Sequence, residues 1–289
     1  MIGQFTGFLS GPFETFGFMR IALVACVALA LSNGPIGTLL LMRRESLEGN
    51  VMSHAVMPGA ALGYLYAGYS LSALTLGGLL TGLAVAGLAA LTARSRPQHQ
   101  DSRLIAFYLV SLSFGVLVVA ARGSQADLMH VLFGTVLAID VKALTLIASI
   151  SSVTMLIVAI FYRPLMVESF DPAFLRAVGG GGGAFRAIFI MLVALNLVAS
   201  FQAFGTLLAI GPILLPAAAA RCWTNKVWPM IVLATVIGML AAFAGLLVSY
   251  YANLPSGPAI VVGTGVLYGM SLLAAGRVRL RPKRLEGRQ

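Results

Sequence analysis

The feature that most constrains this chain is the recurrence of apolar stretches of about 20 residues, each long enough for a helix to cross a bilayer. Inside a bilayer only helices and closed barrels satisfy all their backbone hydrogen bonds. The residues are 59% hydrophobic and 10% charged, whereas about a quarter of the residues in soluble domains are charged. The sequence therefore predicts an all-α, polytopic integral membrane protein with one transmembrane domain over residues 1–289.

About nine stretches have the length and apolarity of membrane spans. They cover approximately residues 21–41, the segment from 54 to the tyrosines at 64–69, and residues 71–91, 104–121, 141–161, 187–204, 207–220, 230–250 and 259–275. Eight or ten spans are the alternatives, because residues 1–19 form a mixed lead segment and stretch 207–220 contains Pro212 and Pro216. The lead lacks a basic region before an apolar core, so we expect no cleaved signal peptide.

The distribution of Lys and Arg predicts the orientation, because these residues favour the cytoplasmic side. With the tail from Arg277 placed in the cytoplasm, only Arg20, Arg122 and Lys142 fall outside. The cytoplasmic loops then hold Arg43, Arg44, Arg94, Arg96, Arg103, Arg163, Arg176, Arg186, Arg221 and Lys226. We therefore expect a multi-pass protein of the bacterial plasma (inner) membrane with a cytoplasmic C-terminus. The net charge of +10 reflects this topology and not binding to nucleic acid.

Several catalytic motifs are missing from the sequence. It has no G-x-x-x-x-G-K-[ST] nucleotide loop, and the glycine run 179–183 is followed by Ala-Phe-Arg, which favours a helix stop. G-x-S-x-G, H-E-x-x-H and paired carboxylates are also missing. Cys26 and Cys222 lie in or at the end of apolar spans and predict no disulfide framework. We expect a transport protein without a tightly bound cofactor, in which Asn33 and Asn196 hydrogen-bond between helices.

Residues 49–59 form the first candidate site. On a helix, Asn50, Ser53, His54 and Met57 share one face, because they are spaced by three or four residues. Pro58 has no N–H to offer the carbonyl of His54, which becomes a spare oxygen ligand. Polar groups converging inside a membrane favour a site on a transport path. The alternative is that His54 packs between helices and hydrogen-bonds to a neighbour.

Residues 169–179 form the second candidate site, in the longest polar interruption of the apolar pattern. Asp171 is a favourable N-cap, and Pro172 suits the first position of a helix. The sequence thus predicts a short amphipathic helix at the cytoplasmic surface. Either this helix rests on lipid, or it docks into a partner protein with Phe170 and Phe174 as its anchors.

Both segments resemble the permease (membrane) subunits of zinc/manganese ABC importers, the ABC-3 type. Residues 43–59 are similar to the family signature Arg-Arg-x-Ser-Leu-x-Gly-Asp-x-x-Ser-His-Ala-x-x-Pro-Gly. Further similar segments are residues 127–134, 162–165, 169–172, 215–221 and 249–259. The resemblance covers nearly the whole chain. It implies a non-enzymatic homodimeric permease, driven by two copies of a cytoplasmic ATPase subunit and supplied by an extracytoplasmic metal-binding protein.

The resemblance also implies roles for individual residues. His54 matches the histidine that lines the metal path, whereas Asn50 stands where the family usually has aspartate. Segment 169–179, with Ser169, Phe170, Asp171, Pro172 and Phe174, matches the part of the family that contacts the ATPase. Further candidates for the metal path are Met57, Pro58, Asp127 and His130.

The expected cargo is zinc, because an imidazole with few carboxylates favours zinc over manganese. Manganese or iron is the alternative within the same family. A secondary metal transporter is a less favoured class, because it would need a coupling carboxylate at mid-membrane. No acidic residue lies in the middle of a predicted span. A structural or receptor-like membrane subunit is the third class.

Overall fold

The computed structural model describes residues 11–43, 54, 56, 58–63, 66, 70–93, 113, 117, 134, 136–171, 174, 182–205 and 207–279. Its main elements are α2 (Gly17–Arg43), α4 (Leu71–Ala93), α7 (Val141–Ile160), α8 (Tyr162–Phe170), α10 (Gly182–Phe204), α11 (Gly211–Trp223), α12 (Val227–Ala252) and α13 (Ser256–Arg279), with a 3-10 turn, η2 (Val136–Ala138). No strand occurs in these ranges. The predicted all-α class is therefore confirmed.

Five helices of the described part are long and apolar enough to cross a membrane, namely α2, α7, α10, α12 and α13. Helix α4 contributes a shorter apolar stretch, Ser72–Ala84. The chain is thus a polytopic membrane protein. The predicted span 104–121 lies outside the described residues except for positions 113 and 117.

The predicted span 207–220 differs from expectation. It folds as turns over residues 207–210 followed by the 13-residue helix α11. A helix of this length measures about 20 Å, whereas the hydrocarbon core of a bilayer is about 30 Å thick. Pro212 and Pro216 lack the N–H groups that a continuous helix needs at their positions. Helix α11 alone is therefore too short to cross a bilayer.

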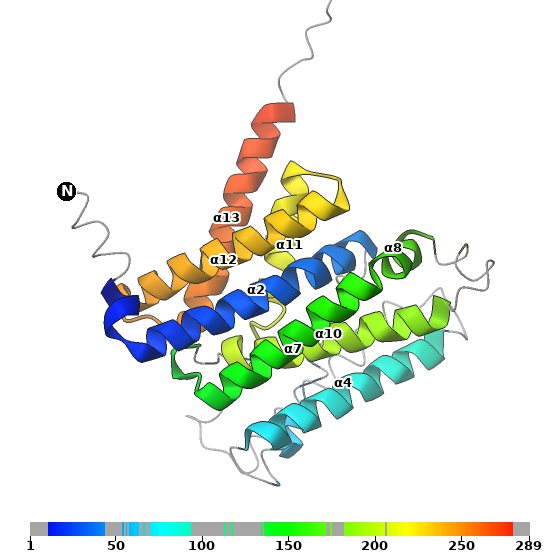
Figure 1. Ribbon diagram of the computed structural model, residues 1–289, viewed down its shortest axis with the longest axis horizontal. Coiled ribbons are helices and arrows are strands. Elements are labelled where there is room, and N and C mark those ends of the chain that lie inside the picture. Colours follow the sequence, from blue (N-terminus) through cyan, green and yellow to red (C-terminus); the bar gives the residue numbers. More distant parts are fainter. Residues whose placement is uncertain are drawn as a thin grey trace, which may run out of the picture.

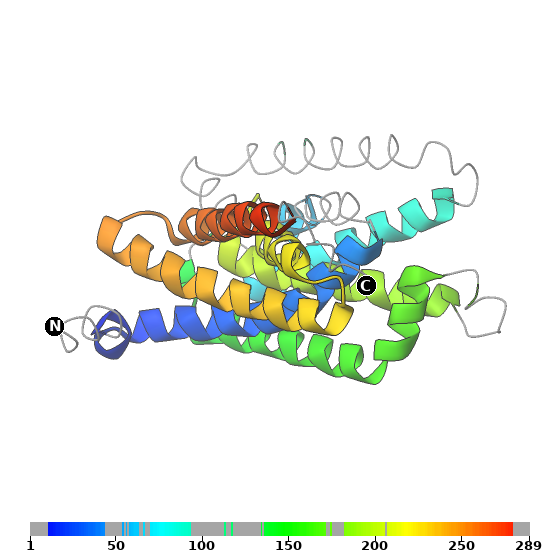
Figure 2. The ribbon, with the colours of Figure 1, turned by 90° about the horizontal axis from the view of Figure 1, so that it is seen from above.

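Helix α2 is at the centre of the bundle. It packs against α12, α11, α7, α10 and α8, while α10 also contacts α7 and α4. Figure 1 shows α12, α2, α7, α10 and α4 running alongside one another, whereas α13 leaves the bundle at a steep angle. Figure 2, the view from above, shows α12 (orange) crossing α2 (blue), with α7 (green) along the lower edge of the view.

Glycines allow the helices to approach closely at the centre of this bundle. A Cβ atom at Gly37 would overlap the carbonyl oxygen of Ile213 in α11, and one at Gly34 would overlap the hydroxyl of Thr235 in α12. Small residues have this effect in membranes, because they allow backbones to touch. The packing of α2 against α11 and α12 therefore depends on these two positions having no side chain.

Candidate functional site

His54 lies in a helical segment packed against α4. The histidine is buried with an exposed fraction of 7%, and the apolar side chains of Val56, Ala60 and Ala61 are buried beside it in the sequence. Pro58 is buried and helical as well. Asn50 and Met57 lie outside the described residues, so the shared face of Asn50 and His54 remains a prediction.

Close backbone contact fixes this segment against α4. A Cβ atom at Gly59 would overlap the carbonyl oxygen of Gly77, and a Cβ atom at Gly77 would overlap that of Gly59. Gly78 and Gly82 of α4 face the side chain of Val56. Gly77, Gly78 and Gly82 of α4 thus form the surface on which the His54 segment packs.

The described residues contain no group of three or more His, Cys, Asp or Glu side chains that could hold a metal ion. Asp127 and His130 fall outside those residues, as does Asn50. A transport path needs ligands that release the ion as readily as they bind it. In the segment that is similar to the family signature, His54 is the described residue whose side chain can bind a metal ion.

Hydrogen bonds between polar side chains join the helices at the centre of the bundle. Asn33 Nδ2 of α2 donates to Ser200 Oγ of α10 at 3.1 Å. Asn196 Nδ2 of α10 donates to Thr154 Oγ1 of α7 at 2.8 Å. The prediction that Asn33 and Asn196 bond between helices is confirmed, although the sequence did not indicate their partners.

Two further contacts join helices in the same way, and these four pairs of polar side chains are called the polar layer below. Ser32 Oγ of α2 lies 3.1 Å from Ser151 Oγ of α7. Gln202 Nε2 of α10 donates to Thr75 Oγ1 of α4 at 3.2 Å. Helix α10 thus bonds to α2, α7 and α4, and α4 in turn holds the His54 segment. The candidate path residue is connected to the centre of the bundle through α4 and α10.

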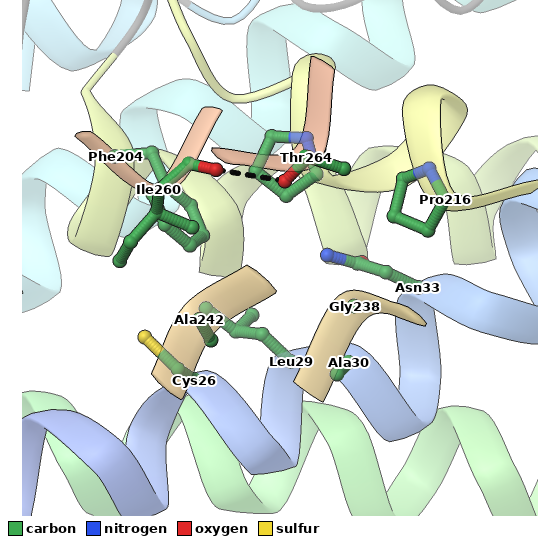
Figure 3. A pocket seen from close by; sticks show the side chains of 11 residues that line it. Cys26, Leu29, Ala30, Asn33, Phe204, Pro216, Gly238, Ala242, Ile260 and Thr264 are labelled. Carbon is green, nitrogen blue, oxygen red and sulfur yellow. Dashed lines mark hydrogen bonds between the residues drawn. The ribbon is translucent and has the colours of Figure 1, made fainter. Parts of the chain in front are cut away.

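A small cavity lies beside Asn33. Its volume is about 20 Å³, and α2, α11, α12 and α13 line it together with Phe204 of α10. Figure 3 shows the Asn33 side chain extending from α2 into the space bounded by Leu29, Pro216 and Thr264. Asn33 Oδ1 is buried and accepts no hydrogen bond from the described part of the chain. This volume is enough for about one water molecule.

The second candidate segment follows α8. Asp171 Oδ1 accepts a hydrogen bond from the backbone N–H of Phe174 at 2.9 Å, which is the predicted N-cap geometry. Phe170 and Phe174 are exposed by 58% and 55%. Two large aromatic side chains therefore protrude on either side of the cap. Pro172 lies outside the described residues.

The helix before this cap was not predicted by the sequence analysis, which ended a span near residue 161 and placed Ser169 and Phe170 in a polar interruption. Ser169 and Phe170 instead end α8, which begins at Tyr162. The predicted span 141–161 ends shortly before Pro164, which instead lies in the first turn of α8, where its missing N–H needs no partner. Gly182 from the glycine run opens α10, and the start of this run, where the sequence favours a helix stop, lies outside the described residues.

Arg43, the last residue of α2, joins this segment to the bundle. Its Nε donates to Ser169 Oγ at 2.9 Å, and its Cζ lies 4.0 Å from the centre of the Phe189 ring in α10. Ser169 Oγ donates in turn to the carbonyl oxygen of Leu165 at 2.6 Å. The sequence analysis used Arg43 only as a topology charge and missed this contact. Its position at the start of the family signature was the one available signal.

The chain has counterparts among known proteins along nearly its whole length. The profile of the ABC 3 transport family matches residues 15–275. The chain is 32% identical to the manganese transport system membrane protein MntC of Listeria innocua, over 93% of this chain and 94% of the relative. It is 28% identical to the manganese import system permease protein ScaB of Streptococcus parasanguinis, over 95% and 96% of the two chains.

A solved structure has the same fold. A chain of PsaBC from Streptococcus pneumoniae in complex with Fab superimposes with a TM-score of 0.85 at 27% identity. The superposition covers 97% of this chain and 98% of the other.

Proposed function

Since this chain belongs to the ABC 3 transport family, we propose that it is the membrane-spanning permease of an ATP-driven importer of divalent metal, with manganese as its cargo. The observation that carries the proposal is the end-to-end similarity to membrane proteins named for manganese transport and import. This chain belongs to a transport family, and its sequence lacks catalytic motifs. We therefore infer that a separate subunit hydrolyses ATP.

We propose manganese as the cargo in place of zinc, which the sequence analysis expected. That expectation rested on His54 and on the neutral amide of Asn50. The relatives' names favour the alternative, manganese. The ligand chemistry is compatible with it, because imidazole suits many divalent transition metals and manganese accepts oxygen ligands. An amide oxygen at Asn50 and the imidazole of His54 would together hold the ion weakly enough to release it.

The proposed assembly is a homodimer of this chain with two cytoplasmic ATPase subunits, fed by an extracytoplasmic metal-binding protein. The exposed rings of Phe170 and Phe174 beside the Asp171 cap support docking of the ATPase at this segment. The assembly lies in the bacterial plasma membrane with the C-terminus in the cytoplasm. A cysteine at Gly287 is then shielded from an impermeant thiol reagent, whereas one at Asn253, exposed in the α12–α13 turn, is labelled.

A secondary metal transporter fits the described residues less well. The carboxylates of Asp140 and Asp171 cap helices, and Glu168 lies near the end of α8. None of these three lies at the middle of a span, where ion coupling would need a carboxylate.

Uptake of Mn²⁺ and Zn²⁺ by proteoliposomes that contain this chain, its ATPase and its binding protein tests the proposal. We expect ATP-dependent uptake of Mn²⁺ in preference to Zn²⁺, and its loss in His54→Ala with assembly and basal ATP hydrolysis retained. His99→Ala is the matched control, because its histidine belongs to a basic loop between predicted spans. A preference for Zn²⁺ would refute the cargo, and normal uptake by His54→Ala would make that segment structural.

A further inference from the structure

Arg43 connects three helices at one end of the bundle. It ends α2, its Nε donates to Ser169 Oγ of α8, and its guanidinium lies over the Phe189 ring of α10. Figure 1 shows α8 beside this end of α2. Ser169 comes two residues before Asp171, whose carboxylate accepts the N–H of Phe174. The last residue of the central helix is therefore bonded directly to the segment proposed to dock the ATPase.

This geometry requires an arginine. The guanidinium is flat, so its face can lie on an aromatic ring while an N–H in its plane donates to a hydroxyl. A lysine ammonium carries the same charge as a point, and it cannot replace the cation–π contact with Phe189 and the Nε bond together. Arg43→Lys thus keeps the charge at the end of α2 and removes the geometry.

Both partners of Arg43 are held by close-packed surroundings. Ser169 is bonded to Leu165, which is fully buried, and the exposed fraction of Phe189 is 1%. Leu165 and Phe189 belong to one apolar cluster with Leu39 and Leu40 of α2. Packed interiors deform little, so a displacement of α8 is passed to α2 more readily than it is absorbed locally.

Helix α2 leads from this junction to the polar layer. Ser32 and Asn33 of the same helix bond to α7 and α10. A shift at Arg43 therefore reaches α7 and α10 through these bonds of α2.

We propose that Arg43 is a positioning residue that couples the ATPase-docking segment to the movement of α2, an inference that rests on the proposed function. Phe170 and Phe174 bind the ATPase, and Arg43 passes on the displacement that ATP binding causes there. Loss of the aromatic residues weakens ATPase binding. Loss of the Arg43 geometry leaves binding intact and uncouples hydrolysis from uptake.

The experiment compares Arg43→Lys with the wild type in the full complex in proteoliposomes. We expect unchanged copurification of the ATPase, basal ATP hydrolysis within about twofold, and about tenfold less Mn²⁺ taken up per ATP, within the usual range of coupling between sites. Ser169→Ala removes the hydrogen bond to Arg43, together with the bond to Leu165 within α8, and leaves the contact of Arg43 with Phe189 in place, so we expect about a threefold loss. The double variant should lose less than the product of the two, because both changes remove the same hydrogen bond.

Two matched controls use the same substitutions elsewhere. Arg20→Lys changes an exposed arginine at the other end of α2. Ser149→Ala removes an exposed hydroxyl of α7 that donates to the carbonyl of Leu146 in its own helix. Both should keep the wild-type ratio of uptake to hydrolysis. Equal losses of uptake and ATPase copurification in Arg43→Lys, or an unchanged ratio, would overturn the inference.

A second measurement needs no cargo. Spin labels at Leu31 of α2 and Val262 of α13, both exposed, are placed in a chain whose Cys26 and Cys222 are replaced by alanine. ATP binding should change their distance in the wild type and not in Arg43→Lys. The same change in both, or none in the wild type, would overturn the inference.

These readouts separate the two proposals. An Arg43-dependent distance change without Mn²⁺ uptake would refute the cargo alone. Failure of any ATPase to copurify with the wild type would refute both.

Discussion

Helices α2 and α13 are similar in length and apolarity but differ in burial. They have 27 and 24 residues, and each contains an 18-residue window apolar enough to span a membrane. In that window 72% of the α2 residues are buried within the chain, compared with 17% for α13. Apolarity therefore identifies both as spans and does not indicate which one is surrounded by protein.

The polar residues of the two helices differ in the bonds they make. Ser32 and Asn33 of α2 bond to α7 and α10. Thr264 and Ser271 of α13 donate to the carbonyls of Ile260 and Leu267 in their own helix, each at 2.8 Å. A hydroxyl can use its single proton on the preceding turn, whereas an amide has two N–H groups and an oxygen to satisfy. Asn196 accordingly donates both to Leu192 of its own helix and to Thr154 of α7. An asparagine in a span is thus a better sign of a hydrogen bond to another helix than a serine or threonine.

The largest effect is expected at a glycine of α2. Gly37→Val would place a side chain against the carbonyl of Ile213, and the displacement of α11 should cost about 3 kcal/mol. Thermal unfolding of the purified chain in detergent measures it. Gly265→Val is the matched control, because a Cβ there meets nothing within 4 Å in the described chain. Equal destabilisation by both changes would contradict the conclusion that α2 is packed more closely against other helices than α13.

An intermediate effect is expected at the amide of α2. Asn33→Leu removes the bond to Ser200 and should lower the free energy of unfolding by about 1 kcal/mol. Asn33→Leu with Ser200→Ala should cost less than the sum of the two single changes, since they share this bond. Additive losses, measured by denaturation in mixed micelles, would mean that the hydrogen bond contributes nothing.

The smallest effect is expected on α13. Ser271→Ala removes a hydroxyl bonded to its own helix, and stability should change by about 0.5 kcal/mol or less. The same denaturation assay applies to the isolated chain. A loss as large as that of Asn33→Leu would show that α13 depends on a neighbour through Ser271.

The sequence analysis predicted the features that depend on residues close to one another along the chain. Apolar runs located the spans formed by α2, α7, α10, α12 and α13, and the Asp171 cap followed from a bond to a residue three positions away. The contact of Arg43 with Ser169 joins residues 126 positions apart, and no local pattern indicates it. The start of α8 was missed because Pro164 suits both the end of one helix and the first turn of the next. The placement of Asn50, Asp127 and His130 remains a prediction.

The long separation between Asn33 and its partner has a consequence for synthesis. Asn33 and Ser200 are 167 positions apart, and ribosomes add roughly 5 to 20 residues per second. Helix α2 therefore waits roughly 10 to 30 s after its own synthesis before its hydrogen-bond partner exists, at that rate of elongation. During this interval an amide is exposed to lipid or to the insertion machinery. Nascent chains stalled before Ser200 should therefore be the forms most readily cleared by membrane proteases.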